Sequence, residues 1–464
     1  MNRRIPWLVT VALLAGCAVG PDYQPPQTTM PDGWIGSSDS AAPVGLATWW
    51  QIFRDPKLTA LMNEALRTNL DIQLAAARVR EARFSRGIIA GGLWPAVNAS
   101  ASYQRTRQGS AGEQNLFQTG LDALWEADIF GGIRRNVESA EANILAAQEG
   151  LHDVQVSLAA EVALNYVQLR GFQQQIAIAR DNLEAQRHTA DITRQRFSAG
   201  FVSGLDVANA NAQVAATEST IPVLQTSARQ SIYALSVLLA RPPADLLNEL
   251  AETRPQPVTP PEVPVGLPSE LLRRRPDIRQ AEAKLHAATA QIGVAVADFF
   301  PTFSLTGSLN WRADKLSSLS GGDARSWAFG PSVNWPIFQG GSIAANVRVQ
   351  EALRDQAYIT YQKTVLAALQ DVENALIAYA KEWEHNKSLN DAVTANRKAV
   401  RISTQLYTEG QTDFLNVLQS QRALYLSQTA YVQSDTSLNQ DLIALYKALG
   451  GGWDTAPAPA PPGG

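Results

Sequence analysis

The chain has 464 residues and a formal net charge of −4, and its longest basic run is Arg273-Arg274-Arg275. This charge balance argues against a nucleic-acid partner, because such proteins present a strongly basic surface. Charged residues make up 18% of the sequence, below the roughly 25% of typical soluble domains, so uncharged polar residues must cover much of the surface.

The N-terminus resembles a bacterial lipoprotein signal. Two arginines precede an apolar run over 7–14, which is far shorter than the roughly 20 residues of a membrane-spanning helix. Two small residues then lead to Cys17, the only cysteine of the chain. We therefore expect a signal peptide over 1–16 and lipidation of Cys17 by acyl chains such as palmitate. Ala18 in place of aspartate favours the outer membrane. The alternative is an ordinary secretory signal with a chance cysteine.

The segment that follows predicts a helix, two strands, a very long helix, a turn and a last helix. We expect helices over 56–92, 133–198 and 205–239, strands over about 94–105 and 116–127, and a tip turn over 199–204. Apolar residues recur every seven positions in the long helix, from Val137 to Leu158, which is coiled-coil spacing. Ordinary helical packing explains each stripe, but not a helix roughly 100 Å long at 1.5 Å per residue.

The second half repeats this order about 210 residues later. Leu70-Asp71-Ile72 recurs as Pro276-Asp277-Ile278, and Trp94-Pro95 recurs as Phe300-Pro301. The repeats are predicted over 56–239 and 276–449, with later strands over about 300–312 and 325–337, a long helix over 342–408 and a tip turn over 409–413. The shorter helices of each half, stacked end to end, match one long helix. A linker over 240–275 and a disordered tail over 450–464 complete the chain.

The strands alternate apolar and polar residues with a period of two. Large apolar side chains share one face of the second pair of strands, namely Phe303, Leu305, Leu309, Trp311, Trp327, Phe329 and Trp335. Alternation with aromatic ends is typical of a lipid-facing β-barrel, although a sheet half-buried on a soluble core alternates as well. Four strands cannot close a barrel, since about eight is the practical minimum. Several protomers must then share one barrel.

No pattern of catalytic or metal-binding residues is present. The histidines His152, His188, His286 and His385 fall on predicted helices and are interpreted as solvated residues. The sequence contains no HExxH, no GxSxG and no Walker A motif. We therefore predict a protein that is not an enzyme, with no cofactor and no metal, whose transport energy comes from a partner.

Several segments together resemble the TolC-like outer-membrane efflux proteins, in particular the lipidated NodT/OprM-type branch. They are the Leu14–Cys17 lipobox, Gly20-Pro21-Asp22-Tyr23, the run Trp49–Pro56, the run Leu271–Ile278, Phe300-Pro301, and the duplication. The resemblance implies a homotrimer with a twelve-stranded outer-membrane barrel and a periplasmic α-helical tunnel, surrounded by an equatorial belt. Residues 17–55, 240–275 and the C-terminal end are expected in that belt.

The resemblance also implies a function. It predicts the exit duct of a tripartite efflux system, fed by a periplasmic adaptor protein and an inner-membrane pump of the RND type, for drugs or other small toxic compounds. The alternatives are the outer-membrane duct of a type I protein secretion system and a structural envelope lipoprotein.

The two helix–helix turns are expected to form the closed end of the tunnel. The candidate tip and gate residues are Gly200, Gly204, Asp206, Gly410, Asp413, Asn416 and Gln419. The glycines permit backbone angles that stop a helix. Relatives carry aspartates where this chain has Asn416 and Gln419, so Asp206 is the best candidate for a carboxylate ring. Asp206 and Asp413 are equally interpreted as helix N-caps.

Overall fold

The computed structural model describes residues 18–35, 45–109, 111–257, 260, 266 and 268–454. The signal peptide, Cys17 and residues 455–464 lie outside the described residues. The chain divides into two units. Unit 1 holds the described residues up to Thr28, Ala77–Gly150 and Asp277–Thr364, and unit 2 holds Thr29–Ala76, Leu151–Pro276 and the described residues from Val365 onward. Among the described helices, none combines the length and apolar character needed to cross a bilayer.

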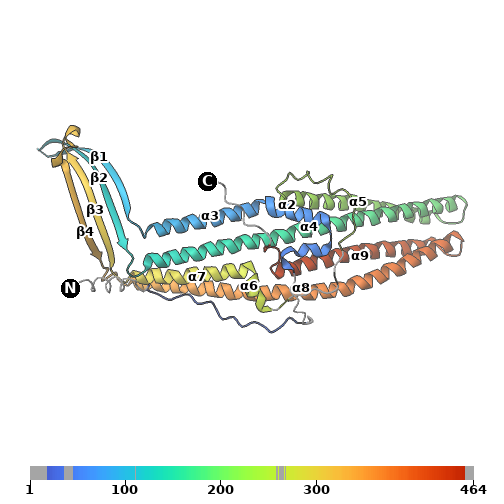
Figure 1. Cartoon of the computed structure of the whole chain (residues 1–464). Coiled ribbons are helices and arrows are strands. Elements are labelled where there is room, and N and C mark those ends of the chain that lie inside the picture. The colour runs from blue at the N-terminus through green and yellow to red at the C-terminus, as the bar shows by residue number, and fades with distance from the viewer. Residues whose placement is uncertain are drawn as a thin grey trace. The chain divides into compact units, whose positions relative to one another are not determined.

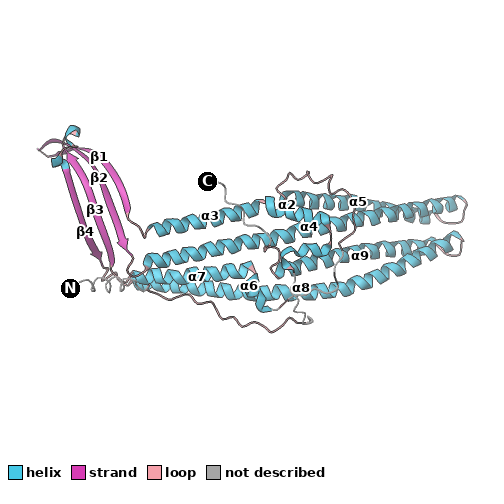
Figure 2. Ribbon diagram, in the orientation of Figure 1, coloured by secondary structure: helices cyan, strands magenta, loops and turns pink. Residues whose placement is uncertain are grey.

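Helices dominate the chain, and four strands interrupt them (Figures 1 and 2). The elements are η1 (Leu46–Phe53), α2 (Pro56–Thr68), α3 (Leu70–Gly91), β1 (Ala96–Gln108), β2 (Ala111–Ala127), α4 (Gly132–Ser198), α5 (Gly204–Leu238), η2 (Pro268–Glu270), α6 (Leu271–Arg274), α7 (Pro276–Ala297), β3 (Thr302–Ala313), η3 (Leu316–Ser318), η4 (Gly322–Ala324), β4 (Arg325–Asn334), α8 (Ser342–Thr408) and α9 (Phe414–Ala448). The long helices α4 and α8 have 67 residues each, with bounds within a residue of those predicted.

The four strands form one antiparallel sheet in the order β1-β2-β3-β4, all within unit 1. The register pairs Leu121 with both Ala99 and Leu309, and it pairs Leu309 with Trp327. Odd-numbered residues of all four strands therefore share one face, because paired residues project to the same side. Strands β1 and β4 are the open edges of this sheet.

The helix predicted over 56–92 is broken at Asn69 into α2 and α3. Asn69 adopts φ −56° and ψ 137°, and its side-chain oxygen accepts hydrogen bonds from the amides of Asp71 (2.8 Å) and Ile72 (3.2 Å). Its side-chain nitrogen Nδ2 donates to the carbonyl of Leu238 at 2.9 Å, where α5 ends. Asn69 thus caps the start of α3 and also binds the carbonyl end of α5.

The second half contains the corresponding joint. Arg275 lies between α6 and α7, and its Nη1 donates to the carbonyl of Ala448 at 3.1 Å, where α9 ends. The same guanidinium is ion-paired with Asp371 at 3.1 Å. Proline at the first position of α7 costs no hydrogen bond, because that amide has no helical acceptor. In both halves, then, a side chain just before a helix binds the carbonyl end of the half's last helix, and different residue types make this contact.

The first residues of the predicted disordered tail are packed in unit 2. The amide of Gly451 donates to the carbonyl of Tyr446 at 3.0 Å, and the ring of Trp453 stacks on His152 at 4.4 Å. Trp49 stacks on Tyr446 at 5.2 Å, so the N-terminal 3₁₀ helix and the end of α9 share one aromatic cluster. Rings in stacked contact stabilise this junction beyond the area they bury.

The joint at Asn69 is expected to be a main determinant of the stability of unit 2. Asn69→Ala removes two capping bonds and leaves the carbonyl of Leu238 without its donor, which should cost about 1–3 kcal/mol. Thermal unfolding followed by the helical circular dichroism signal should show a lower midpoint. Arg78→Ala, an exposed change further along α3, should leave the midpoint unchanged, and equal midpoints for the two variants would contradict the joint.

Candidate functional site

The sheet separates apolar from polar side chains by face. Phe303, Leu305, Leu309, Trp311, Trp327 and Phe329, all predicted to face lipid, lie on the odd-numbered face, and Trp335 follows directly after β4. Trp327 and Phe329 are 73% and 68% exposed in the single chain. The even-numbered face carries mostly serine, threonine and asparagine from Thr302 to Asn310. An apolar face this exposed needs a partner or a lipid phase to cover it.

Two tryptophans mark the base of the sheet, where β2 and β4 end. The indole of Trp125 donates to the carbonyl of Leu93 at 3.0 Å, and the indole of Trp335 donates to the carbonyl of Phe299 at 3.1 Å. Each acceptor lies two residues before a proline that leads into a strand, so the duplicated halves repeat this contact. Tryptophan with a bonded indole and an exposed ring is typical of a membrane–water interface.

The segment after Cys17 is fixed in unit 1 by Arg135 of α4. The guanidinium donates to the carbonyl of Val19 at 3.1 Å and pairs with the Asp22 carboxylate at 2.6 Å. Its Nη1 is 2.8 Å from Glu138. The side chain of Arg135 is only 6% exposed, so the charge needs these acceptors. Burial raises the pKa of Glu138, but hydrogen bonds from Arg135 and His286 outweigh it, and the net pKa is lowered.

A close backbone contact also holds the segment after Cys17, and we call this contact together with the Arg135 bonds the N-terminal clamp. Gly131 has a φ of +80°, and a Cβ there would lie 2.7 Å from the Cα of Ala18.

Two histidines are packed rather than solvated. His286 is half-buried, stacked on Tyr23 at 4.3 Å, with Nε2 3.0 Å from Glu138. The interpretation of His286 as a solvated residue is therefore wrong, and so is that of His152, which stacks on Trp453. Both partners are too distant in sequence for a local pattern to reveal them.

Both tip turns, which lie in unit 2, stop a long helix in the same way. Gly200 and Gly410 have φ values of +79° and +78°. The amide after each glycine donates back across the last helical turn, from Phe201 to Arg196 and from Gln411 to Leu406, both at 2.8–2.9 Å. This is the Schellman arrangement that glycine favours. Gly204 differs from the expectation, because it begins α5 and has no positive φ.

The polar candidates at the tips have capping geometry. Asp206 accepts bonds from the amide and hydroxyl of Ser203 at 2.9 and 2.8 Å, and Ser203 accepts from the Asp206 amide. The N-cap is therefore Ser203, and Asp206 is its capping-box partner. Asp413 occupies the N-cap position of α9 without a side-chain capping bond. Asn416 donates to Thr412 at 2.8 Å and is exposed, and Gln419 is exposed as well.

Arg196 connects the two tips within one chain, which the sequence did not suggest. Its Nη1 donates to the carbonyl of Tyr407 at 2.6 Å, and its guanidinium lies 4.8 Å from the centre of the Tyr407 ring. Tyr407 is 1% exposed and binds Thr193 at 3.2 Å, whereas Phe197, its counterpart in the first tip, is 48% exposed. A small apolar cluster includes Tyr407, Phe414 and Val417. The duplicated tips are thus alike in backbone and different in side chains.

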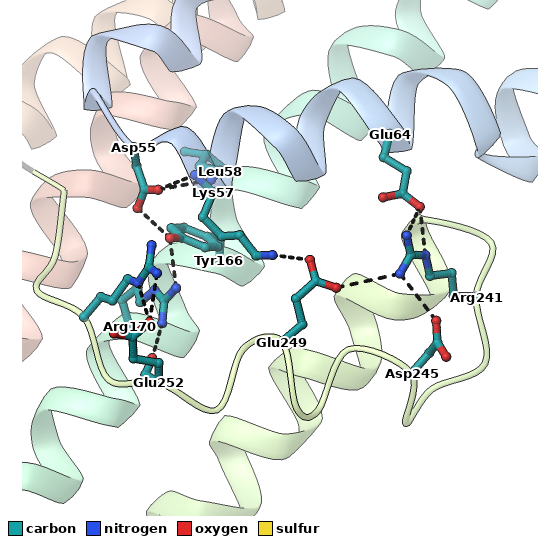
Figure 3. Close-up of polar contacts among 11 residues, drawn as sticks. Asp55, Lys57, Leu58, Glu64, Tyr166, Arg170, Arg241, Asp245, Glu249 and Glu252 are labelled. Carbon is teal, nitrogen blue, oxygen red and sulfur yellow. Dashed lines mark hydrogen bonds and ion pairs between the residues drawn. The ribbon is translucent and has the colours of Figure 1, made fainter.

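A polar network fixes the start of α2 against α4 in unit 2 (Figure 3). Asp55 caps α2 by accepting from the amide of Lys57 at 2.8 Å, and it also accepts from the hydroxyl of Tyr166. Arg170 donates to that hydroxyl at 3.0 Å and to the carbonyl of Glu252 at 2.8 Å. Burial and the bond to Asp55 raise the pKa of Tyr166 to about 12, so the hydroxyl stays protonated.

A second chain of ion pairs in Figure 3 ties the segment after α5 to α2. Arg241 pairs with Glu64 and lies 3.8 Å from Glu249, which pairs with Lys57. The network from Asp55 through Arg170 to Glu252 therefore brings together residues from two of the segments that we expected in the belt, 17–55 and 240–275. In the described part of the chain, no group of three or more acidic, histidine or cysteine residues is placed to hold a metal ion.

Known proteins are similar to this chain in both sequence and fold. The model of the family described as "Outer membrane efflux protein" matches residues 61–241 and 267–451, that is, most of each repeat. The chain belongs to the outer membrane efflux protein family. The resemblance found in the sequence is confirmed, and with it an outer-membrane location and a role in efflux.

Relatives of this family match over nearly the full length. Nodulation protein T of Rhizobium leguminosarum bv. viciae is 34% identical over 99% of this chain and 95% of its own. The probable efflux pump outer membrane protein TtgC of Pseudomonas putida is 33% identical over 96% and 94%. Among solved structures, the outer-membrane channel OprN has a TM-score of 0.85 at 38% identity, covering 94% of this chain and 100% of that one.

The link between the tips is expected to stabilise their closed backbone turns. Arg196→Ala removes a charge-assisted hydrogen bond worth about 1–2 kcal/mol at a half-buried site. Hydrogen exchange at the amides of Gly410 and Gln411 should accelerate about 5- to 30-fold. Arg194→Ala is the matched control, because Arg194 lies two residues from Arg196 and its exposed ion pair is with Asp191 on the same helix. Unchanged exchange in Arg196→Ala would show that the turns do not depend on this contact.

Proposed function

We propose that this protein is the outer-membrane exit duct of a tripartite efflux system and passively conducts small toxic organic compounds. The observation that carries the proposal is the sheet with one apolar face, one polar face and two open edges, in a chain of the outer membrane efflux family. Relatives named as toluene and antibiotic efflux pump components support small molecules rather than proteins as cargo.

The open edges support a trimer. In lipid every backbone amide and carbonyl needs a partner, so β1 and β4 must pair with other strands. Pairing β4 of one copy with β1 of the next, around three copies, gives twelve strands and a closed barrel. The apolar face then meets lipid and the polar face lines a wet lumen, as in other outer-membrane barrels.

The remaining parts of the duct follow from the same arrangement. Acyl chains on Cys17 anchor the N-terminus to the outer membrane, and the Arg135 clamp holds the segment that follows. The long helices form a periplasmic tunnel whose tips meet an adaptor protein, and an inner-membrane pump of the RND type supplies the energy. The capped turns at Gly200 and Gly410 keep the resting tunnel closed until the adaptor engages them.

Substitutions on opposite faces of β3 test the orientation of the sheet. Leu305→Arg places a charge in lipid at a cost of about 2–4 kcal/mol near the midplane, so trimer yield in outer-membrane fractions should fall sharply. Thr306→Arg, its neighbour on the polar face, should assemble normally and alter single-channel conductance. Equal loss of trimer in both variants would indicate a sheet that is covered by protein on both faces.

The charge of Asp206 is expected to contribute to ion selectivity at the tips. Three copies around the axis of a trimer attract cations, so Asp206→Ala should lower cation selectivity and weaken block by divalent ions in planar bilayers. Ser203→Ala is the matched control, because it breaks the same capping box without removing a charge. Identical selectivity in the two variants would restrict Asp206 to its capping role.

A further inference from the structure

A group of arginines lies at the far end of the apolar face, where β1 leads into β2 and β3 into β4. Arg105 and Arg107 are odd-numbered residues of β1, and Arg325 is the first residue of β4 and pairs with Trp311. All three are exposed. Between Tyr103 and the base of the sheet, all the strand residues on this face are uncharged. The cations of the face are therefore confined to one end.

Acidic compensation on this face is incomplete. Glu113 pairs in register with Arg107 and forms an ion pair with Arg105, whose side chain is still 61% exposed. Three arginines against one glutamate leave a net charge of +2 on this face of the sheet in each copy. An exposed ion pair is worth little in water, so Arg105 remains available to a stronger anion.

Aromatic rings lie directly beneath the arginines. Tyr103 and Phe117 have ring centres 4.7 Å apart, and the hydroxyl of Tyr103 donates to Asn115 at 3.0 Å. Trp327 is the next residue of β4 on the same face as Arg325. Aromatic rings mark the boundary between acyl chains and headgroups, so the arginines are at headgroup depth.

The structure assigns Arg105, Arg107 and Arg325 to a binding surface for the phosphate groups of a phosphorylated glycolipid in the outer leaflet. This rests on the proposed function, because it requires the apolar face to meet outer-membrane lipid. Guanidinium groups bind phosphate oxygens in bidentate fashion and are weakly hydrated, which suits a membrane interface. The glycolipid's acyl chains cover the apolar face below while its phosphates engage the arginines above.

The surface is completed by a second copy of the chain. Arg105 and Arg107 are on one edge strand of the sheet, and Arg325 is on the other. When β4 of one copy pairs with β1 of the next, as we propose, Arg325 and the arginines of its neighbour lie on the two strands that form one junction. The trimer then carries three equivalent phosphate-binding surfaces, one at each junction between copies.

Binding of lipid A to the delipidated trimer, measured by native mass spectrometry, tests this assignment. The double variant Arg105→Gln/Arg325→Gln should bind bis-phosphorylated lipid A about 25-fold more weakly, at roughly fivefold for each arginine near a charged interface. Arg312→Gln is the matched control, because Arg312 is near the same end of the sheet on the even-numbered face. Glu113→Gln should bind more tightly, since it removes a competing carboxylate.

Wild-type affinity in the double variant would overturn the assignment, as would equal loss in Arg312→Gln. Undiminished binding of dephosphorylated lipid A would also overturn it, because recognition would then depend on acyl chains alone. Trimer assembly is measured separately in every variant. A failure of the proposed function would appear instead as normal assembly of Leu305→Arg, so the two failures are distinguishable.

Discussion

Unpaired strand edges are the constraint on which the rest of this molecule depends. Along β1 and β4 every second residue directs its amide and carbonyl away from the sheet, and in lipid each unpaired group costs several kcal/mol. One face of the sheet is also apolar and exposed. Water can bind the unpaired edge groups but does not cover the apolar face, and lipid covers the face but leaves the edge groups unpaired. Membrane insertion and association of copies are thereby coupled, since only a closed ring of strands meets both demands.

Because the chain is duplicated, each tip turn, strand base and helix joint occurs twice, and the two copies can be compared. The tips share a glycine turn and the strand bases share an indole–carbonyl bond, which are backbone requirements that either copy must satisfy. The helix joints use Asn69 in one half and Arg275 in the other, although both bind the carbonyl end of a helix. Side chains differ between the halves where a joint needs only a hydrogen-bond donor, and Arg196 alone of the aligned tip residues contacts the opposite tip through its guanidinium.

Local periodicity explains which features could be predicted from the sequence. The period-two pattern located the strands, the heptad spacing located α4 and α8, and glycine marked both tip turns. The break at Asn69 was missed because the apolar pattern continues through it, although the aligned proline at 276 was a usable signal. Ser203 and Asp206 have the spacing of a capping box, so their capping of α5 could be predicted from the sequence. Arg135 with Asp22, and Arg196 with Tyr407, were not predictable, because their partners are over 100 residues away.

The N-terminal clamp and the arginines at the far end define one orientation of the sheet. Ala18 lies against Gly131, just beyond the base of β2. In the duct that we propose, acyl chains attached to the residue before Ala18 enter the periplasmic leaflet, and the base of the sheet with Trp125 and Trp335 then belongs to that leaflet. The opposite end of the apolar face then reaches the outer leaflet. Within the sheet, arginines are found at that end alone, where Glu113 is the one acidic residue of the apolar face and phosphorylated headgroups supply further anions.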